Sequence, residues 1–166
     1  FPECQQRAYE EVKSIVGTKT AFDYEDYQKM KYLHASVLES LRIVPLGGFI
    51  DRVCTVDTVI AGQEVPKGMV VEFNMHHMQM NPEYFPEPET YRPERFLKDQ
   101  DGPVNDLDAY MTFGHGPKNC VGKRLALMNI LVLLSNLVLR YKIECTEKSP
   151  SLPLKIKGGF RGNDIT

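Results

Sequence analysis

The stretch FGHGPKNCVG at residues 113–122 decides how the rest of the chain is interpreted. It places Cys120 behind a loop with three glycines and a proline, at the start of a long apolar run. A thiol at a helix N-terminus faces unpaired backbone N–H groups and the positive end of the dipole, which favours the thiolate. Such a thiolate can ligate a metal or act as a nucleophile. The alternative is a structural cysteine buried behind a turn, because free cysteines are commonly buried.

Length and composition indicate one ordinary domain, or a fragment of one, over residues 1–166. The hydrophobic content of 42% and charged content of 25% are typical of a globular chain, and the net charge of −2 gives no reason to expect nucleic acid. The four cysteines form no Cys-x-x-Cys pair, which argues against a zinc ribbon and favours a reducing compartment. The longest apolar run, residues 125–139, is shorter than a membrane span needs, so we expect a buried helix there.

The first part of the chain predicts three helices, over residues 2–16, 24–30 and 32–42. Asp23 can cap the second helix, and Pro45 prevents the third from continuing. The run after Cys120 predicts the longest helix of the chain. It presents at helical spacing Leu125, Met128, Val132, Ser135 and Leu139.

Short strands are predicted between and after these helices. β-Branched residues alternate with polar ones over residues 52–60 and 69–74, which predicts a small antiparallel sheet. Residues 142–145 and 152–157 also have the character of strands, with a turn and a final strand beyond them. The predicted fold class is therefore α+β and mainly helical, with small antiparallel sheets and a cysteine loop before a long helix.

Three motifs occur in a fixed order along the chain. They are Glu39-x-x-Arg42, the PERF segment at residues 93–96, and the Phe-x-x-Gly-x-x-x-Cys-x-Gly pattern that ends with Cys120 and Gly122. In this order they resemble the haem-thiolate proteins of the cytochrome P-450 family, closest to animal microsomal members that oxidise drugs and steroids. The similarity covers the whole chain but corresponds to roughly the C-terminal third of such proteins. The family's oxygen-activating distal helix and membrane anchor would lie ahead of Phe1.

The resemblance implies a site for haem b, with Cys120 as the axial thiolate that binds iron. An aromatic side chain near the sulfur, here Phe113, would shield it from water. Arg52 would pair with one haem propionate, and Lys118 stands where the family usually carries an arginine for the same task. The implied cofactor-binding residues are Arg52, Phe113, Gly114, Lys118 and Gly122.

The resemblance also implies a buried charge triad of Glu39, Arg42 and Arg95 behind the cysteine loop. Without it, an i, i+3 pair such as Glu39 and Arg42 would usually be a solvated salt bridge of little worth. A buried acid with two arginines is costly unless fully hydrogen-bonded, so its expected role is to fix geometry.

Two segments would face the substrate by the same resemblance. They comprise Leu46, Gly47, Gly48, Phe49, Ile50, Gly159 and Phe160. The chain departs from the family pattern at Gln79 and Met80, where the family tends to show His-Arg.

The implied function is a monooxygenase that inserts one oxygen atom from dioxygen into a lipophilic small molecule. Its electrons would come from NADPH through a flavoprotein NADPH-cytochrome reductase, with cytochrome b5 as a further donor. The basic residues Lys98, Lys118, Lys123 and Arg124 would suit docking of an acidic redox partner, or form an ordinary solvated face. The implied location is the cytosolic face of the endoplasmic reticulum membrane. The alternatives are a truncated non-enzymatic haem-binding or interaction domain, and a metal-free cysteine protein.

Overall fold

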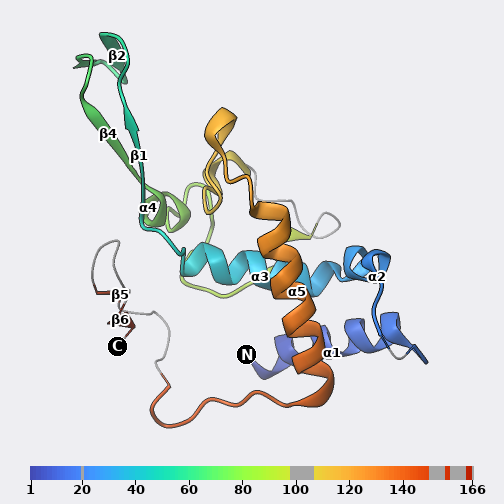
Figure 1. The fold of residues 1–166 in the computed structure, drawn as a ribbon. Coiled ribbons are helices and arrows are strands. Elements are labelled where there is room, and N and C mark those ends of the chain that lie inside the picture. The colour runs from blue at the N-terminus through green and yellow to red at the C-terminus, as the bar shows by residue number, and fades with distance from the viewer. Residues whose placement is uncertain (20, 98–106, 150–155, 158–163, 166) are drawn as a thin grey trace.

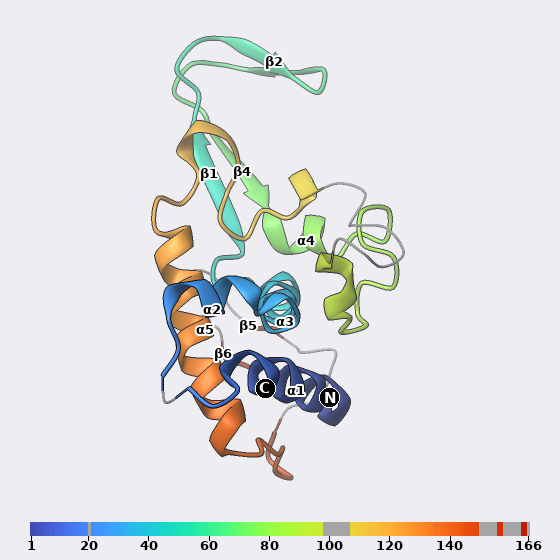
Figure 2. The same ribbon diagram turned by 90° about the vertical axis from the view of Figure 1, so that its right-hand side faces the viewer.

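The computed structural model describes the chain except for residues 20, 98–106, 150–155, 158–163 and 166. Its main body consists of α1 (Pro2–Val16), α2 (Tyr24–Lys29), α3 (Lys31–Ile43) and α5 (Lys123–Arg140). α5 runs alongside both α1 and α3 (Figures 1 and 2). The predicted helices are all present, with ends within two residues of the expected ones for the first three.

Local sequence sets the ends of the first two helices. Pro2 occupies an early position of α1, and Gly17 follows its end with a φ of 52°, in the left-handed region that favours glycine. Asp23 caps α2 by accepting a hydrogen bond from the Asp26 amide at 2.9 Å. The Asp26 carboxylate in turn accepts from the Asp23 amide at 3.2 Å, which completes a capping box.

The hydrophobic core lies where α1, α3 and α5 meet. Its buried members are Ala8, Val12, Met30, Tyr32, Leu33, Val37, Leu127 and Leu131.

The expectation that α5 is a buried helix is wrong for part of its surface. Leu125 and Leu133 are exposed, at 67% and 60%, while Leu127 and Leu131 face the core. Of the spaced residues predicted from the sequence, Ser135 is buried, whereas Val132 is exposed. α5 is apolar around most of its circumference, so periodicity could not select the face that packs.

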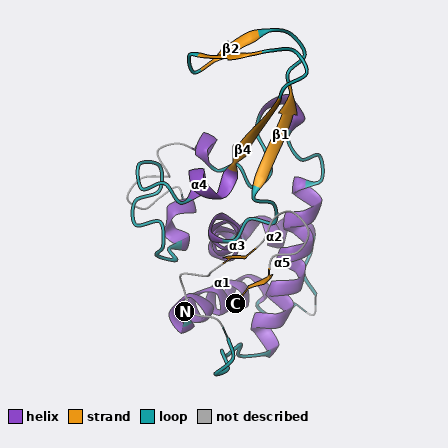
Figure 3. Cartoon of the chain, turned by 90° about the vertical axis from the view of Figure 1, so that its left-hand side faces the viewer, coloured by secondary structure: helices purple, strands orange, loops and turns teal. Residues whose placement is uncertain are grey.

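A narrow antiparallel ribbon projects from the helical body (Figures 1 and 3). β1 (Phe49–Val53) pairs with β4 (Val70–Asn74), and Asp51 lies opposite Glu72. At the far end β2 (Thr58–Ile60) pairs with β3 (Gln63–Val65). The antiparallel arrangement was predicted, but the single strand expected over residues 52–60 is interrupted. At the interruption, the Cys54 amide donates to the Met69 carbonyl at 2.8 Å. The Asp57 carboxylate accepts from the Lys67 amide, also at 2.8 Å.

The predicted strand at residues 142–145 is wrong, because this described part of the chain forms no strand pairing. Instead the side-chain amide of Gln5 forms hydrogen bonds with the backbone of Ile143. It accepts from the Ile143 amide at 2.8 Å and donates to the Ile143 carbonyl at 3.2 Å. Further on, β5 (Ile156–Lys157) pairs with β6 (Asp164–Ile165), while the rest of the strand expected over 152–157 lies outside the described residues.

Short helical turns connect these parts. They are α4 (Met75–Gln79) and the 3-10 turns at Pro93–Phe96, Leu107–Ala109 and Gly116–Lys118. The architecture is thus mainly helical with small antiparallel sheets, as predicted. Among the described helices, none is both long and apolar enough to cross a membrane.

Candidate functional site

The loop that carries Cys120 is shaped by two glycines and by bonds within its own backbone. Gly114 and Gly116 have φ values of 72° and 73°, which L-residues rarely adopt. The Gly114 amide donates to the Met111 carbonyl at 2.8 Å, and the Cys120 amide donates to the Phe113 carbonyl at 2.7 Å. These bonds close the loop so that Cys120 returns beside Phe113.

Cys120 is exposed, and α5 begins three residues after it at Lys123. Gly122 occupies the N-cap position of α5 without a side-chain cap, so the first turn of the helix is left open toward the loop. The ammonium group of Lys123 lies 5.6 Å from the centre of the Phe113 ring. The N-terminus of α5 and the Lys123 ammonium group therefore follow the Cys120 thiol closely in the chain.

Arg52 reaches the same loop from strand β1. Its Nη2 lies 3.5 Å from the Lys118 carbonyl, and its Nη1 donates to the Asp51 carbonyl at 2.7 Å. Ile50 also approaches the loop, 3.9 Å from the place that a Cβ on Gly114 would occupy. Within the described part of the chain, neither Arg52 nor Lys118 pairs with a carboxylate. The loop therefore presents an exposed thiol and two neighbouring cations.

The triad residues Glu39, Arg42 and Arg95 are brought together inside the protein. Arg42 donates from Nε to Glu39 Oε2 at 2.8 Å and from Nη2 to Glu39 Oε1 at 3.0 Å. Arg95 donates from Nε to Glu39 Oε1 at 3.2 Å. Glu39 and Arg42 are 0% exposed and Arg95 is 4% exposed, so solvent does not screen these charges.

Backbone carbonyls accept further guanidinium hydrogens of this network. Arg42 donates to the carbonyls of Gln79 at 2.8 Å and Pro88 at 2.6 Å, and Arg95 donates to the carbonyl of Glu87 at 2.7 Å. Burial lowers the pKa of Arg95, while the Glu39 carboxylate acts in the opposite direction. Among the described residues no buried side-chain nitrogen or oxygen lacks a hydrogen bond. The network thereby fastens the segment around residues 87–95 to α3.

The predicted substrate-facing residues are only partly described. Leu46 is 83% exposed, Phe49 is exposed at the start of β1, and Ile50 is half-buried near Gly114. The Gly48 carbonyl accepts from the Met75 amide at 2.9 Å, which ties this segment to α4. Gly47 is half-buried, whereas Gly159 and Phe160 lie outside the described residues.

Sequence reasoning missed two polar side chains that join distant segments. Glu11 on α1 accepts from the amides of Tyr32 at 2.7 Å and Leu33 at 2.9 Å, at the N-terminus of α3. Gln79 was noted only as a departure from a pattern, yet its side chain bonds three groups in the interior. No periodicity marks either residue, since their partners lie more than 20 residues away.

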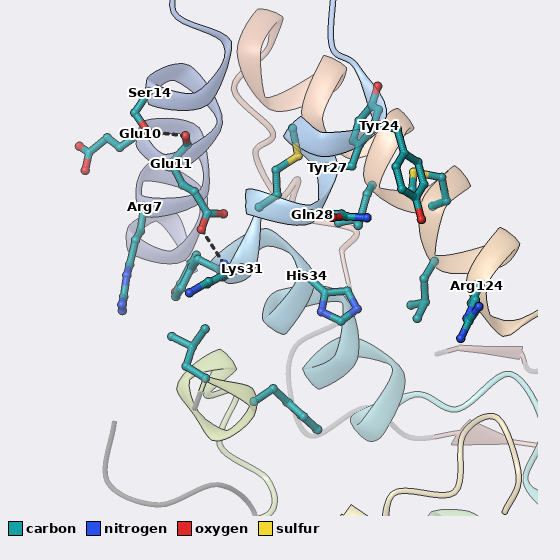
Figure 4. A pocket seen from close by; sticks show the side chains of 17 residues that line it. Arg7, Glu10, Glu11, Ser14, Tyr24, Tyr27, Gln28, Lys31, His34 and Arg124 are labelled. Carbon is teal, nitrogen blue, oxygen red and sulfur yellow. Dashed lines mark hydrogen bonds between the residues drawn. The ribbon is translucent and has the colours of Figure 1, made fainter. Parts of the chain in front are cut away.

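A groove of about 1050 Å³ opens between α1, α2, α3 and α5 (Figure 4). Glu11, His34 and Arg124 lie along it, and burial lowers the pKa of His34. No residue of the 113–122 loop lines the groove. It is therefore separate from the exposed thiol.

Comparison with known proteins agrees with this architecture of a cysteine loop ahead of a long helix. The family model described as cytochrome P450 matches residues 1–161. Cytochrome P450 3A19 of Capra hircus aegagrus is 39% identical over 93% of this chain and 70% of its own length. Cytochrome P450 3A1 of Rattus norvegicus and cytochrome P450 3A13 of Mus musculus are each 36% identical, again over 93% of this chain.

The chain belongs to the cytochrome P450 family. The predicted resemblance to the xenobiotic-oxidising type of this family of monooxygenases is thereby confirmed. The chain spans 30% of the length of the rat and mouse relatives that it matches.

Proposed function

We propose that this chain is the proximal haem-binding portion of a haem-thiolate monooxygenase, with Cys120 as the axial ligand of haem b. The observation that carries the proposal is the exposed Cys120 thiol on its glycine-shaped loop, next to Arg52 and Lys118. A thiolate is the protein ligand that the family uses for iron, and two cations suit the two carboxylates of a haem.

The residues of the loop fit such a group in chemistry and in shape. Arg52 and Lys118 would neutralise the propionates, and Lys118 would do so as a point charge without a bidentate fork. Gly114 would let the backbone approach the porphyrin closely, because it carries no side chain and its φ of 72° disfavours any L-residue in its place. Phe113 would shield the sulfur from water. When bound, the iron supplies dioxygen activation, favoured by electron donation from the thiolate.

The role proposed for Glu39, Arg42 and Arg95 is to hold the scaffold behind the loop. Their network joins α3 to the segment around residues 87–95, where Glu39 Oε1 also accepts from the Arg92 amide at 2.9 Å. It is too buried to take part in chemistry at the thiol. Removing one member would leave a buried charge unpaired.

The proposed substrate is a lipophilic small molecule, near the segment from Leu46 to Ile50. The proposed electron donors are an NADPH-cytochrome reductase and cytochrome b5, at the cytosolic face of the endoplasmic reticulum membrane. The exposed cations Lys118, Lys123 and Arg124 support docking of an acidic partner, since opposite charges steer association. Lys98, which would join them, lies outside the described residues.

A haem titration tests the proposal. Haem added to the purified chain is expected to bind with a stoichiometry of one, as measured by the growth of its Soret absorbance. Cys120→Ser should abolish or greatly weaken binding, because the hydroxyl is a poor iron ligand. Cys145→Ser is the matched control, since Cys145 is also exposed and lies outside the loop. Equal binding by both variants would contradict the proposal.

A second candidate function is a haem-binding or interaction domain without oxygenase activity. The open surroundings of the loop favour it, because Cys120 is exposed and Val121 is 103% exposed. Both candidates predict haem binding through Cys120. Product formation from a lipophilic substrate separates them only in a protein that also supplies the oxygen-activating groups.

A further inference from the structure

Gln79 is the last residue of α4 and is completely buried. An uncharged amide in the interior needs partners for both its N–H and its oxygen, since an unpaired polar group is costly there. Gln79 finds these partners on two different parts of the chain. One part is the buried charge network, and the other is the start of the Cys120 loop.

One end of the Gln79 side chain reaches the buried charge network. Its Nε2 donates to the Arg42 carbonyl at 3.1 Å, while Arg42 Nη1 donates to the Gln79 backbone carbonyl at 2.8 Å. Gln79 and Arg42 are thus joined in both directions. Because Arg42 also donates two hydrogen bonds to Glu39, this end of the amide is joined to the buried network on α3.

The other end reaches the start of the Cys120 loop. Gln79 Oε1 accepts from the Met111 amide at 3.1 Å and from the Thr112 hydroxyl at 2.9 Å. The Met111 carbonyl accepts in turn from Gly114, and the Phe113 carbonyl accepts from the Cys120 amide at 2.7 Å. Hydrogen bonds therefore connect Arg42 through Gln79 to residues 111 and 112, and the backbone continues from there to Phe113, whose carbonyl bonds the Cys120 amide.

We propose that Gln79 is a positioning residue for Cys120, which fixes the start of the loop at residues 111–113 to the buried Glu39, Arg42 and Arg95 network. The inference rests on the proposed function, because the position of the Cys120 thiol matters for haem binding. The hydrogen bonds of Gln79 are independent of that function. An amide suits this place because it offers a donor to one segment and an acceptor to the other without adding charge beside Arg42. A side chain of the same length without these groups would leave the Met111 amide and the Arg42 carbonyl unpaired.

Gln79→Met tests the inference, since methionine has similar length and no amide. In the haem-free chain, hydrogen exchange of the Met111 and Gly114 amides should accelerate by about 10- to 100-fold, as expected when a buried bond is lost. Tyr91→Phe is the control. It removes a half-buried hydrogen bond to the Ser36 carbonyl on α3, at 3.0 Å, without touching the loop. Equal exchange rates at Met111 in the two variants would overturn the inference.

The haem-loaded chain gives a second readout. Gln79→Met should lower the fraction of reduced, carbon monoxide-bound protein with the thiolate spectrum at least twofold, whereas Tyr91→Phe should leave it unchanged. An unaltered spectrum in Gln79→Met would contradict the inference. If the unsubstituted chain shows no thiolate spectrum, the proposed function fails, and the exchange measurement still decides the role of Gln79.

Thr112→Val covers the case in which Gln79→Met does not fold. It removes one donor to Gln79 Oε1, together with the hydroxyl's contact with the Leu41 carbonyl at 3.2 Å, while keeping the shape of the side chain. Faster exchange at Met111 in Thr112→Val supports the inference. Exchange as slow as in the unsubstituted chain contradicts it.

Discussion

At the scale of single residues, Glu39 is the acid on which two buried guanidinium groups depend. Glu39→Ala should lower the free energy of unfolding by about 3–5 kcal/mol, because Arg42 and Arg95 would remain buried without their carboxylate. Chemical denaturation measures this loss. Glu94→Ala is the control, since Glu94 pairs with Arg7 near the surface and should cost only about 0–1 kcal/mol. Equal denaturation midpoints for Glu39→Ala and the unsubstituted chain would contradict a buried network.

Asp26 should make the free energy of unfolding depend on pH. A hydrogen bond from the Lys19 ammonium lowers the pKa of Asp26 below 3.8, the Asp23 amide acts in the same direction, and burial opposes both. A carboxyl whose pKa is lower in the folded state stabilises the fold above its unfolded pKa, and this contribution is lost as the pH falls through the folded value.

Urea unfolding measures the stability of the unsubstituted chain and of Asp26→Asn from about pH 6 to about pH 3. The unsubstituted chain should lose more stability over this range than Asp26→Asn does. Glu25→Gln, at an exposed position of the same helix, should behave as the unsubstituted chain. A loss in Asp26→Asn as large as in the unsubstituted chain would contradict the assignment.

Spacing in the sequence could predict residues that act within a short motif. Cys120, Phe113 and the pair of Glu39 and Arg42 were predicted in this way, through motifs that resemble the family's. Glu11 and Gln79 could not be found, because a hydrogen bond between segments 21 to 37 residues apart leaves no local pattern. Only the fold brings such residues to their partners.

At the scale of elements, Glu11 takes the place of an N-cap for α3. Met30 precedes this helix and offers no side-chain cap, whereas the Glu11 carboxylate accepts from both the Tyr32 and Leu33 amides. Glu11→Ala should therefore cost about 1–2 kcal/mol of stability, the range known for helix caps. Glu10→Ala, one residue earlier and exposed, should change little. Equal losses in the two variants, measured by thermal or chemical unfolding, would show that the contact contributes nothing.

The elements themselves were largely predictable, and the exceptions have physical reasons. Helix ends followed from Pro2, Asp23 and Gly17, whose effects are local. The packed face of α5 did not follow, because leucines surround the helix and the choice between them depends on α1 and α3. Residues 142–145 have the composition of a strand. A strand also needs a neighbouring strand to pair with, and the described residues provide none there.

At the scale of the whole molecule, the 166-residue chain should bind haem without performing coupled oxygenation. Productive oxygen cleavage needs timed proton delivery and a pocket closed to bulk water. The Cys120 thiol is exposed, so the described residues around it do not close the site to bulk water. With haem, reductase, NADPH and a panel of lipophilic substrates, NADPH consumption should yield peroxide and not hydroxylated product. Coupled hydroxylation at about 1 per second, the low end of ordinary turnover, would contradict this expectation.

The spectrum of the reduced chain with carbon monoxide tests most directly whether Cys120 holds the iron. Thiolate ligation should give a strongly red-shifted Soret band in the unsubstituted chain and in Cys145→Ser. Cys120→Ser should lose haem or change to a spectrum typical of histidine ligation. Persistence of the red-shifted band in Cys120→Ser would show that another group binds the iron, and would contradict the account of this site.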